Sequence, residues 1–218
     1  MDLREILHYV DHTQLATTAV EADIETLIDD AAEAGCSSVC IPPSYVTRAV
    51  SYAAGRVPIC TVIGFPNGYS TTAAKVFETT DAVANGAAEI DMVINLTDVK
   101  NGRDEALQQE ISAVKAACGE RILKVIVETS QLTLDEKIRL CRIVSAAGAD
   151  FIKTSTGFGG GGATVDDVSL FREYCAPHVR IKASGGIRNA ADAAALIEAG
   201  AARLGTSRLV SLWKEAKA

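Results

Sequence analysis

The sequence has few histidines, and its cysteines are not spaced as in a metal or redox motif. The three histidines are His8, His12 and His178, two of them four residues apart and the third in a predicted loop, so no cluster of imidazole ligands is expected. The six cysteines include no C-x-x-C pair, which excludes a zinc knuckle and a thioredoxin-type site. We therefore predict a cytoplasmic protein with reduced thiols and no bound metal.

Basic residues are fewer than acidic ones, and long apolar runs are absent from the sequence. Lys and Arg number 21 against 28 Asp and Glu, and the net charge of −7 at pH 7 argues against nucleic acid or an anionic membrane as the main partner. No run reaches the roughly 18 apolar residues of a membrane span. The charged beginning MDLREILHYVD lacks the apolar stretch of a targeting signal. We expect a protein that acts on small molecules.

Short runs rich in β-branched residues alternate with longer segments of helical period. Eight such runs start at residues 9, 37, 58, 89, 122, 150, 179 and 202, and segments such as 20–35 and 132–148 carry apolar residues at helical spacing between them. Eight strand–helix units predict a closed (β/α)₈ TIM barrel that forms a single domain over residues 1–218. A doubly wound open sheet is the alternative, but no glycine-rich fingerprint follows the first run.

Aromatic residues and regularly placed glycines support the same fold class. Aromatics make up 5% of the chain, so the apolar content comes mainly from Ala, Val, Ile and Leu, as expected for helices packed on buried strands. Four glycines each follow a predicted helix at spacings of 51, 62 and 52 residues, and they are Gly35, Gly86, Gly148 and Gly200. This spacing predicts that they end every second helix of an eightfold array.

Two predicted strands end in a lysine that precedes Ser, Thr and Gly. The stretches DFIKTSTG (150–157) and RIKASGG (180–186) place Lys153 and Lys182 at the carboxyl ends of neighbouring strands, where TIM barrels carry their active sites. Two inward lysines at equal height would each lower the pKa of the other, and a neutral amine can form a Schiff base with an aldehyde or ketone. The alternative is that each stem packs on its neighbours while the ammonium reaches solvent.

Three further polar residues lie near strand ends. Asp91 carries a carboxylate into the apolar run EIDMVIN (89–95), either as a structural ion pair with a lysine or as a relay of protons through water. Both interpretations place it beside the lysines. Asp11 has a similar role or a local hydrogen-bonded one, and Cys40 is either a pocket residue or a small buried residue.

Glycine-rich turns after the last two strands predict a phosphate site. We expect SGG (184–186) and GTS (205–207) to open directly into helices, whose N-termini bind anions. Arg188 and Arg208 are close enough in sequence to add positive charge. Alternatively, the glycines only permit tight turns and the arginines lie on the surface. The run GFGGGG (157–162) is either a flexible linker or, because it follows a strand of the repeat, a mobile loop over the site.

Motifs along nearly the whole chain together resemble one family, the deoxyribose-phosphate aldolases, which are class I aldolases of (β/α)₈ fold. The pair IKTSTG and KASGG, in this order, is highly specific for the family. The resemblance is carried by VDHTQL (10–15), VCIPPSYV (39–46), TVIGFPNGYSTTAAKVFET (61–79), EIDMVIN (89–95), KVIVET (124–129), FIKTSTGF (151–158), IKASGGIR (181–188) and LGTSR (204–208).

The resemblance implies an activity and a set of residues. The reaction is the reversible cleavage of 2-deoxy-D-ribose 5-phosphate to D-glyceraldehyde 3-phosphate and acetaldehyde, in deoxyribose phosphate catabolism, without a cofactor. By the same resemblance, Lys153 forms the Schiff base, Lys182 tunes its pKa and Asp91 shuttles protons. The implied substrate-binding residues are Asp11, Cys40, Thr154, Gly157, Gly185, Gly186, Arg188, Gly205 and Ser207.

One position departs from some members of the family. Those members carry a phosphate-contacting lysine after TSTG, where this chain has Phe158, so Arg188 or Arg208 is expected to supply the charge. A homodimer is expected, because most oligomers are symmetric and the resemblance points the same way. Two other functions stay open: a sugar-phosphate isomerase or epimerase that works through an enediolate, and a non-catalytic barrel that binds a sugar phosphate.

Overall fold

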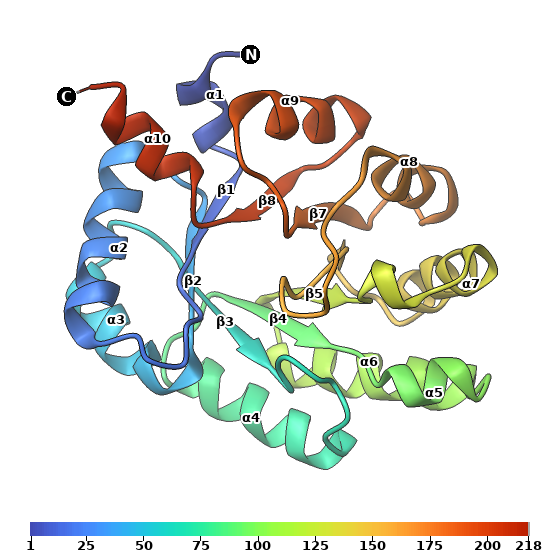
Figure 1. Ribbon diagram of the computed structural model, residues 1–218. Helices are drawn as coiled ribbons and strands as arrows, with labels where there is room; N and C mark the ends of the chain where they lie inside the picture. The colour runs from blue at the N-terminus through green and yellow to red at the C-terminus, as the bar shows by residue number, and fades with distance from the viewer. Residues whose placement is uncertain (218) are drawn as a thin grey trace.

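Eight parallel strands close into a barrel in which each strand pairs with the next in sequence and the last pairs with the first (Figure 1). The computed structural model describes residues 1–217, so Ala218, the end of the predicted domain, lies outside the described residues. The closed ring confirms the predicted TIM barrel and excludes the open sheet. The strands are β1 (Val10–Thr13), β2 (Ser38–Ile41), β3 (Ile59–Ile63), β4 (Glu89–Val93), β5 (Ile122–Ile126), β6 (Phe151–Lys153), β7 (Arg180–Ser184) and β8 (Arg203–Thr206).

One main helix follows each strand and packs outside the ring. These helices are α2 (Glu21–Ala34), α3 (Val46–Ala53), α4 (Thr72–Ala84), α6 (Asp104–Cys118), α7 (Leu134–Ala146), α8 (Val165–Tyr174), α9 (Ala190–Ala199) and α10 (Leu209–Glu215). Four shorter elements are α1 (Leu3–Leu7), α5 (Leu96–Lys100) and the 3₁₀ turns η1 (Pro43–Tyr45) and η2 (Thr129–Gln131). Within residues 1–217, none of the helices combines the length and the apolar character needed to cross a membrane.

Local sequence determines where several helices begin and end. The side chains of Thr71, Thr133 and Thr164 accept hydrogen bonds from backbone N–H groups in the first turns of α4, α7 and α8, which satisfies donors that a helix start leaves free. At the other ends, the four regularly spaced glycines all have positive φ and follow α2, α4, α7 and α9. The prediction that they end every second helix is confirmed.

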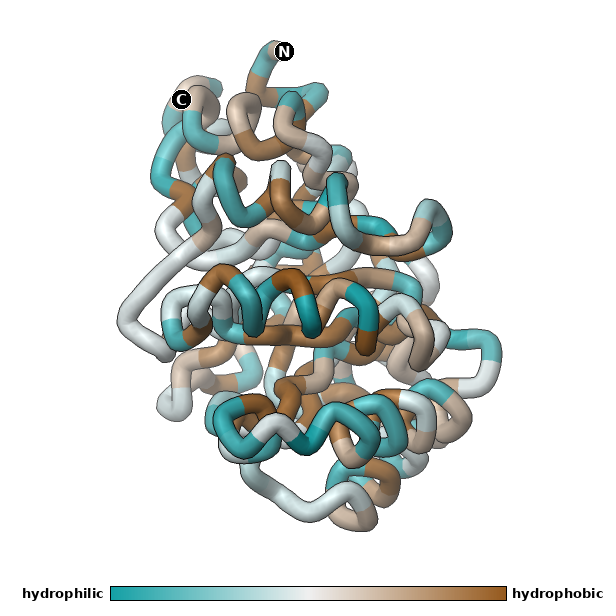
Figure 2. Tube along the Cα trace, turned by 90° about the vertical axis from the view of Figure 1, so that its right-hand side faces the viewer, coloured by the Kyte–Doolittle hydropathy of each residue, from teal (hydrophilic) through white to brown (hydrophobic). Residues whose placement is uncertain are grey.

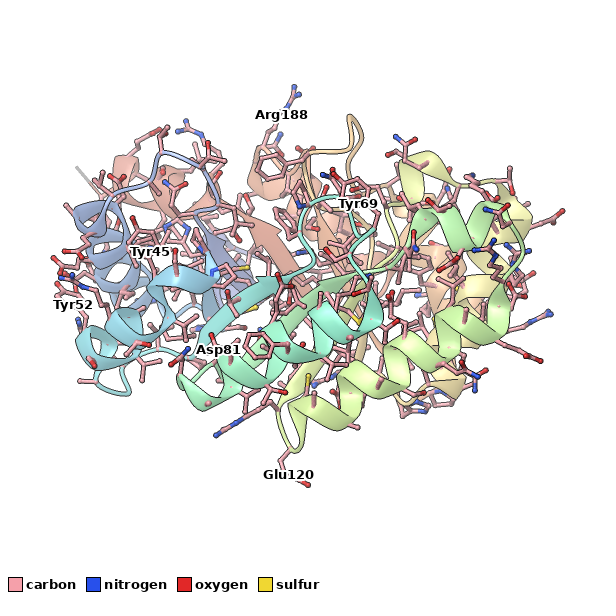
Figure 3. The ribbon with its side chains drawn as sticks, turned by 90° about the horizontal axis from the view of Figure 1, so that it is seen from below. Tyr45, Tyr52, Tyr69, Asp81, Glu120 and Arg188 are labelled. Atoms are coloured by element: carbon pink, nitrogen blue, oxygen red, sulfur yellow. The ribbon has the colours of Figure 1, made fainter. Side chains whose placement is uncertain are left out.

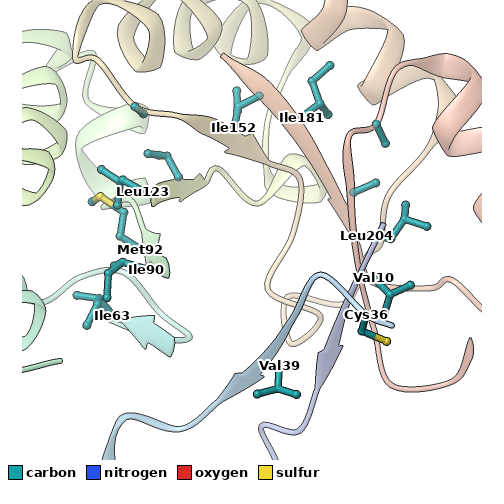
Figure 4. Packing of buried hydrophobic residues seen from close by; sticks show 14 of the residues in the cluster. Val10, Cys36, Val39, Ile63, Ile90, Met92, Leu123, Ile152, Ile181 and Leu204 are labelled. Carbon is teal, nitrogen blue, oxygen red and sulfur yellow. The ribbon is translucent and has the colours of Figure 1, made fainter. Parts of the chain in front are cut away.

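The strands carry two different kinds of side chain on their two faces. The outer face packs on the helices mainly through apolar residues, among them Ile90, Met92 and Ile152, which point away from the barrel centre (Figure 4). Along the helices, hydrophobic and hydrophilic residues alternate, as expected for elements with one buried face (Figure 2). Because side chains alternate along a strand, the residues next to these apolar ones point into the barrel, and many of those are charged.

Steric crowding at Gly68, in the connection from β3 to α4, can be tested against a matched position. Gly68 and Gly102 both have left-handed backbones, with φ of +73° and +66°. A Cβ at Gly68 would lie 1.9 Å from the carbonyl oxygen of Ile94, whereas a Cβ at Gly102 would meet nothing within 4 Å. Gly102→Ala should therefore cost about 1–2 kcal/mol of conformational strain, and Gly68→Ala should cost clearly more. Urea unfolding of both variants measures the difference, and equal losses would contradict the predicted clash.

Candidate active site

The barrel interior near the carboxyl ends of the strands holds a cluster of buried charges. Strand register pairs Lys153 of β6 directly with Lys182 of β7, so the two lysines lie at equal height as predicted. Register likewise pairs Asp91 of β4 with Lys124 of β5. All four side chains are essentially inaccessible to solvent. The alternative that the lysine ammonium groups reach bulk solvent is therefore wrong for the structure described.

Asp91 is the common acceptor in this cluster. One of its oxygens, Oδ2, accepts hydrogen bonds from the Nζ atoms of Lys153 and Lys182, both at 2.7 Å. The other, Oδ1, accepts from Lys124 Nζ at 2.8 Å and from the Cys60 thiol at 3.2 Å. Although burial by itself raises the pKa of Asp91, the three ammonium groups outweigh it and hold this pKa well below its usual value. Asp91 is thus an ionised carboxylate in contact with both predicted lysines.

Lys182 departs from the expectation that each lysine lowers the pKa of the other. Its Nζ also donates to Asp11 Oδ2, so two carboxylates contact this ammonium. Burial by itself lowers the pKa of Lys182, but Asp11 and Asp91 outweigh burial and raise it above its usual value. The mutual lowering predicted from two neighbouring lysines is therefore wrong for Lys182, whose two carboxylate partners favour the charged ammonium.

Three charged residues of the cluster were missed by the sequence interpretation. Lys124 contacts Glu89 at 2.5 Å in addition to Asp91, and its pKa is raised because these carboxylates outweigh the effect of burial. Arg203 of β8 bridges Glu89, at 2.9 Å, and Asp11. The signal was present in the sequence, because each of these residues interrupts an apolar run as Asp91 does.

Two groups of thiol and carboxylate side chains lie close enough together to hold a metal ion. One is Cys40, Cys60 and Asp91, and the other is Asp11, Cys60 and Glu89. The ammonium of Lys124 lies among these atoms, 3.3 Å from Cys60 Sγ and within contact of both Asp91 and Glu89. A cation from the protein already compensates these carboxylates. The burial that raises the pKa of the Cys60 thiol well above its usual value also favours a neutral sulfur, a poor metal ligand.

A cavity of about 620 Å³ opens above this cluster, at the carboxyl ends of the strands. Lys153 is the one member of the cluster that lines it, and Thr156, Phe158 and Ser184 contribute to its wall. Among the predicted binding residues, those that line the cavity are Gly157, Gly185, Gly186, Arg188, Gly205 and Ser207. A second cavity, of about 420 Å³, lies between α2 and α3 on the outside of the barrel and contains none of these groups.

The other predicted residues lie below the cavity or beside it. Asp11 accepts a hydrogen bond from Lys182, and Asp91 accepts one from Lys182 and one from Lys153. Cys40 is fully buried with Cys60 and Val62, next to the partly buried Leu15 and Phe65. The hydroxyl of Thr154 is 3.2 Å from the carbonyl of Ser184, to which it donates, so this side chain joins β6 to β7. The cavity wall does not include Asp11, Cys40, Asp91, Thr154 or Lys182.

The loops after β7 and β8 form the part of the cavity predicted to bind phosphate. The expectation that SGG opens directly into a helix is wrong: α9 begins at Ala190, four residues after Gly186, with Asn189 as its N-cap. Instead, Gly185 and Gly186 both adopt positive φ, which presents their backbone to the cavity. Arg188 lies at this end of the barrel, opposite Glu120 (Figure 3). Arg208 pairs with Glu215 at 3.0 Å, whereas Arg188 forms no ion pair among residues 1–217.

Buried lysines at the carboxyl end of a (β/α)₈ barrel are typical of aldolases that form a Schiff base with their substrate. The chain is a class I aldolase, a carbon–carbon lyase. A model of the DeoC/LacD family aldolases matches residues 5–215, and the chain belongs to this family.

Known relatives cover the chain from end to end. A deoxyribose-phosphate aldolase of Streptococcus agalactiae is 58% identical over 217 residues, which is 100% of this chain and 97% of that protein. A crystal structure of a protein from Coccidioides immitis has 44% identity and a TM-score of 0.95, covering 100% of this chain and 88% of the other. A tetrameric deoxyribose phosphate aldolase from Aeropyrum pernix has 30% identity and a TM-score of 0.89, covering 100% and 93%.

The acid stability of the barrel should depend on the buried carboxylates. The pKa of Asp11 is lowered in the folded state, because Lys182, Lys124 and Arg203 outweigh the opposing effect of burial. A lowered folded-state pKa contributes stability that is complete above about pH 5 and is lost as the pH falls through about 4 and below. Asp11→Asn should reduce the free energy of unfolding at neutral pH by about 3 kcal/mol and should flatten its decline towards acid pH.

Urea unfolding of the two proteins at neutral pH and at acid pH measures this difference. Asp81→Asn is the matched control, because Asp81 lies exposed on α4 (Figure 3). An Asp11→Asn protein whose stability declines with acid as steeply as the wild type would contradict the assignment.

Proposed function

We propose that this protein cleaves 2-deoxy-D-ribose 5-phosphate reversibly to D-glyceraldehyde 3-phosphate and acetaldehyde, with Lys153 as the nucleophile. The observation that carries this proposal is the position of Lys153. Lys153 lines the cavity, its amine contacts Asp91 at 2.7 Å, and Asp91 is its one carboxylate partner within residues 1–217. The substrate is the one named for the Streptococcus agalactiae relative.

The balance of charge in the barrel supports Lys153 as the amine that reacts. Within residues 1–217, the interior cluster contains four cationic side chains but three carboxylates, Asp11, Glu89 and Asp91. A buried excess of positive charge is unfavourable, so the number of carboxylate contacts distinguishes the four cations. Lys124, Lys182 and Arg203 each contact at least two carboxylates. Lys153 contacts one, so it is the cation with the fewest carboxylate contacts, and it is the member of the cluster that lines the cavity.

A neutral Lys153 amine attacks the C1 aldehyde of the open-chain sugar to give a carbinolamine, which loses water to form the imine. The imine accepts the electron pair of the C2–C3 bond when that bond breaks. The C3 hydroxyl loses its proton and becomes the aldehyde of glyceraldehyde 3-phosphate. The remaining enamine takes up a proton at C2, and hydrolysis releases acetaldehyde and the free amine. The imine is itself the electron sink, so we propose that neither a metal nor another cofactor takes part.

We assign the proton transfers to the pair Asp91 and Lys182. Asp91 Oδ2 contacts Lys153 and Lys182 at the same distance of 2.7 Å, so it lies between the reacting nitrogen and a second ammonium. Because the pKa of Asp91 is depressed and that of Lys182 is raised, the resting proton belongs to Lys182. Asp91 and a bridging water would then pass protons to and from the carbinolamine hydroxyl, C3 hydroxyl and C2.

The composition of the cavity wall disfavours an enediolate mechanism. Isomerases of that type need a carboxylate or imidazole base against the substrate carbon. Among the described residues that line the 620 Å³ cavity, none is Asp, Glu or His. A purely binding role is also disfavoured. An exposed lysine would bind a sugar phosphate equally well, so binding alone does not require a lysine buried among other charges.

The cavity loops and the thiols support the remaining proposals. We propose that Gly157, Gly185, Gly186 and Ser207 bind the phosphate through backbone N–H groups, with Arg188 as the compensating cation. Six free cysteines, five of them buried, fit a reducing compartment, and we propose the cytoplasm. We propose a homodimer as the assembly, since two-fold dimers are the commonest closed oligomers.

Borohydride reduction in the presence of acetaldehyde or deoxyribose 5-phosphate should fix an adduct on Lys153. Reduction converts an imine to a stable secondary amine, which peptide mass spectrometry locates. Lys153→Ala should lose both the adduct and turnover, because the nucleophile is gone. Lys137 is a matched control, since it pairs with Asp167 away from the cavity and Lys137→Ala should still form the adduct on Lys153. Near-normal turnover of Lys153→Ala would overturn the assignment.

Arg188 and Arg208 should contribute unequally to binding of the phosphate. Arg188→Gln should raise the KM for deoxyribose 5-phosphate about tenfold, the loss expected for one charge-assisted hydrogen bond. Arg208→Gln should have a smaller effect, because the guanidinium of Arg208 is already paired with Glu215. Steady-state kinetics of both variants with the phosphorylated substrate tests this. A larger rise in KM for Arg208→Gln than for Arg188→Gln would show that Arg208, and not Arg188, is the cation that binds the phosphate.

A further inference from the structure

Glu128, which is outside the cavity wall, occupies an unusual backbone position just beyond β5. Its φ of 56° and ψ of 66° place it in the left-handed region, which is uncommon for a residue other than glycine. The pairing with β6 is irregular here. The N–H groups of Val127 and Thr129, two residues apart, donate to the carbonyls of the adjacent residues Lys153 and Thr154, at 3.0 and 2.9 Å. Glu128 is thus the extra residue of a bulge, a feature that redirects a side chain.

The redirected carboxylate holds the first part of the loop between β6 and α8. Its Oε2 accepts hydrogen bonds from the backbone N–H of Thr156, at 3.2 Å, and from the Thr156 hydroxyl. That hydroxyl oxygen in turn accepts from the N–H of Phe158 at 3.0 Å. The backbone at Gly159 lies directly against the carboxylate, since a Cβ there would be 2.6 Å from Glu128 Cδ. Thr156 and Phe158, which this network holds, both line the cavity.

The 3₁₀ turn η2, which follows Glu128, supports the same loop. The side-chain amide of Gln131 donates to the Gly159 carbonyl at 3.0 Å. A Cβ at Gly161 would lie 2.4 Å from the Cβ of Ser130, so the loop can approach this turn only as glycine. The connection from β5 to α7 therefore forms a cradle for residues 156–161, with Glu128 at its centre.

At its other end, the same loop contacts the turn predicted to bind phosphate. Ala163 N–H donates to the carbonyl of Gly185 at 3.1 Å. A Cβ at Gly162 would lie 2.5 Å from that carbonyl oxygen, so the two backbones are in direct contact. The position of the Gly185 turn is therefore coupled through residues 156–163 to the carboxylate of Glu128.

A buried carboxylate at this position has no ionic compensation. Glu128 is 4% exposed, and no Lys, Arg or His within residues 1–217 forms an ion pair with it. Burying a charge without a counter-charge is unfavourable, as is a left-handed backbone for glutamate. Features that reduce stability in this way are concentrated at functional sites. A contribution to stability therefore does not explain why a glutamate occupies position 128.

We propose that Glu128 is a positioning residue for phosphate recognition: it fixes the glycine loop 156–163 so that Gly157 and, through Gly162, Gly185 present their backbone to the phosphate of the substrate. This inference rests on the proposed function and extends it to a residue that does not touch the substrate. The group it serves is the phosphate monoester, rather than the carbonyl that reacts at Lys153.

Glu128→Gly is the most informative variant, because glycine adopts the left-handed backbone without strain while the carboxylate is removed. We expect the ratio of KM for deoxyribose 5-phosphate to KM for unphosphorylated 2-deoxyribose to rise at least tenfold. The inhibition constant of inorganic phosphate should rise in parallel, which measures binding without turnover. Glu128→Gln, which keeps an acceptor for Thr156, should restore most of the wild-type ratio.

Three controls make the outcome decisive. Ala54→Gly relaxes another left-handed residue, at the end of α3, and should leave the ratio unchanged. Thr156→Val removes the hydroxyl that Glu128 binds. If the two residues act through one another, the double variant with Glu128→Gly should raise the KM ratio by less than the sum of the two single effects. Glu128→Ala also removes the carboxylate but keeps a side chain on the left-handed backbone. Its melting temperature should therefore be lower than that of Glu128→Gly.

A merely structural role would raise both KM values together and lower the melting temperature, with no change in their ratio. A Glu128→Gly protein with the wild-type ratio and the wild-type phosphate inhibition constant would overturn the inference. Failure of the proposed function has a different signature, since the wild-type protein would then form no borohydride adduct at Lys153. The two results are independent, because adduct formation with acetaldehyde does not involve phosphate.

Discussion

The carboxylate of Asp91 is the contact on which the site depends. It accepts hydrogen bonds from three lysines on three strands, β5, β6 and β7, and from a thiol on β3. Ammonium groups this close would repel one another strongly inside a barrel without a shared anion between them. Asp91 therefore makes it possible to bury several lysines together, and the reactive amine is defined by having fewer compensating contacts than its neighbours.

Much of this arrangement could be predicted from the sequence because it follows from periodicity. The eight strand–helix units determine the fold, and the side-chain alternation of a strand then determines that Lys153 and Lys182 point inward together. The starts of the strands, each within one residue, and the role of the four glycines followed from the same regularity.

What could not be predicted depends on register between strands that are distant in sequence. Which carboxylate contacts which ammonium is determined by the stagger of the closed barrel. For that reason the raised pKa of Lys182 was missed, and Lys124, Glu89 and Arg203 were not recognised as parts of one network. The bulge at Glu128 was hidden for a different reason, because KVIVET has no glycine where the backbone becomes left-handed.

The charged interior also has a consequence for how the chain reaches its folded state. Arg203 of the last strand compensates Asp11 of the first, 192 residues earlier in the chain. An incomplete barrel would leave these groups uncompensated in an apolar setting, so partly assembled strands gain little until the ring closes. Such a barrel is expected to form as one cooperative unit, because its interior ion pairs stabilise the closed ring and not a partly assembled one.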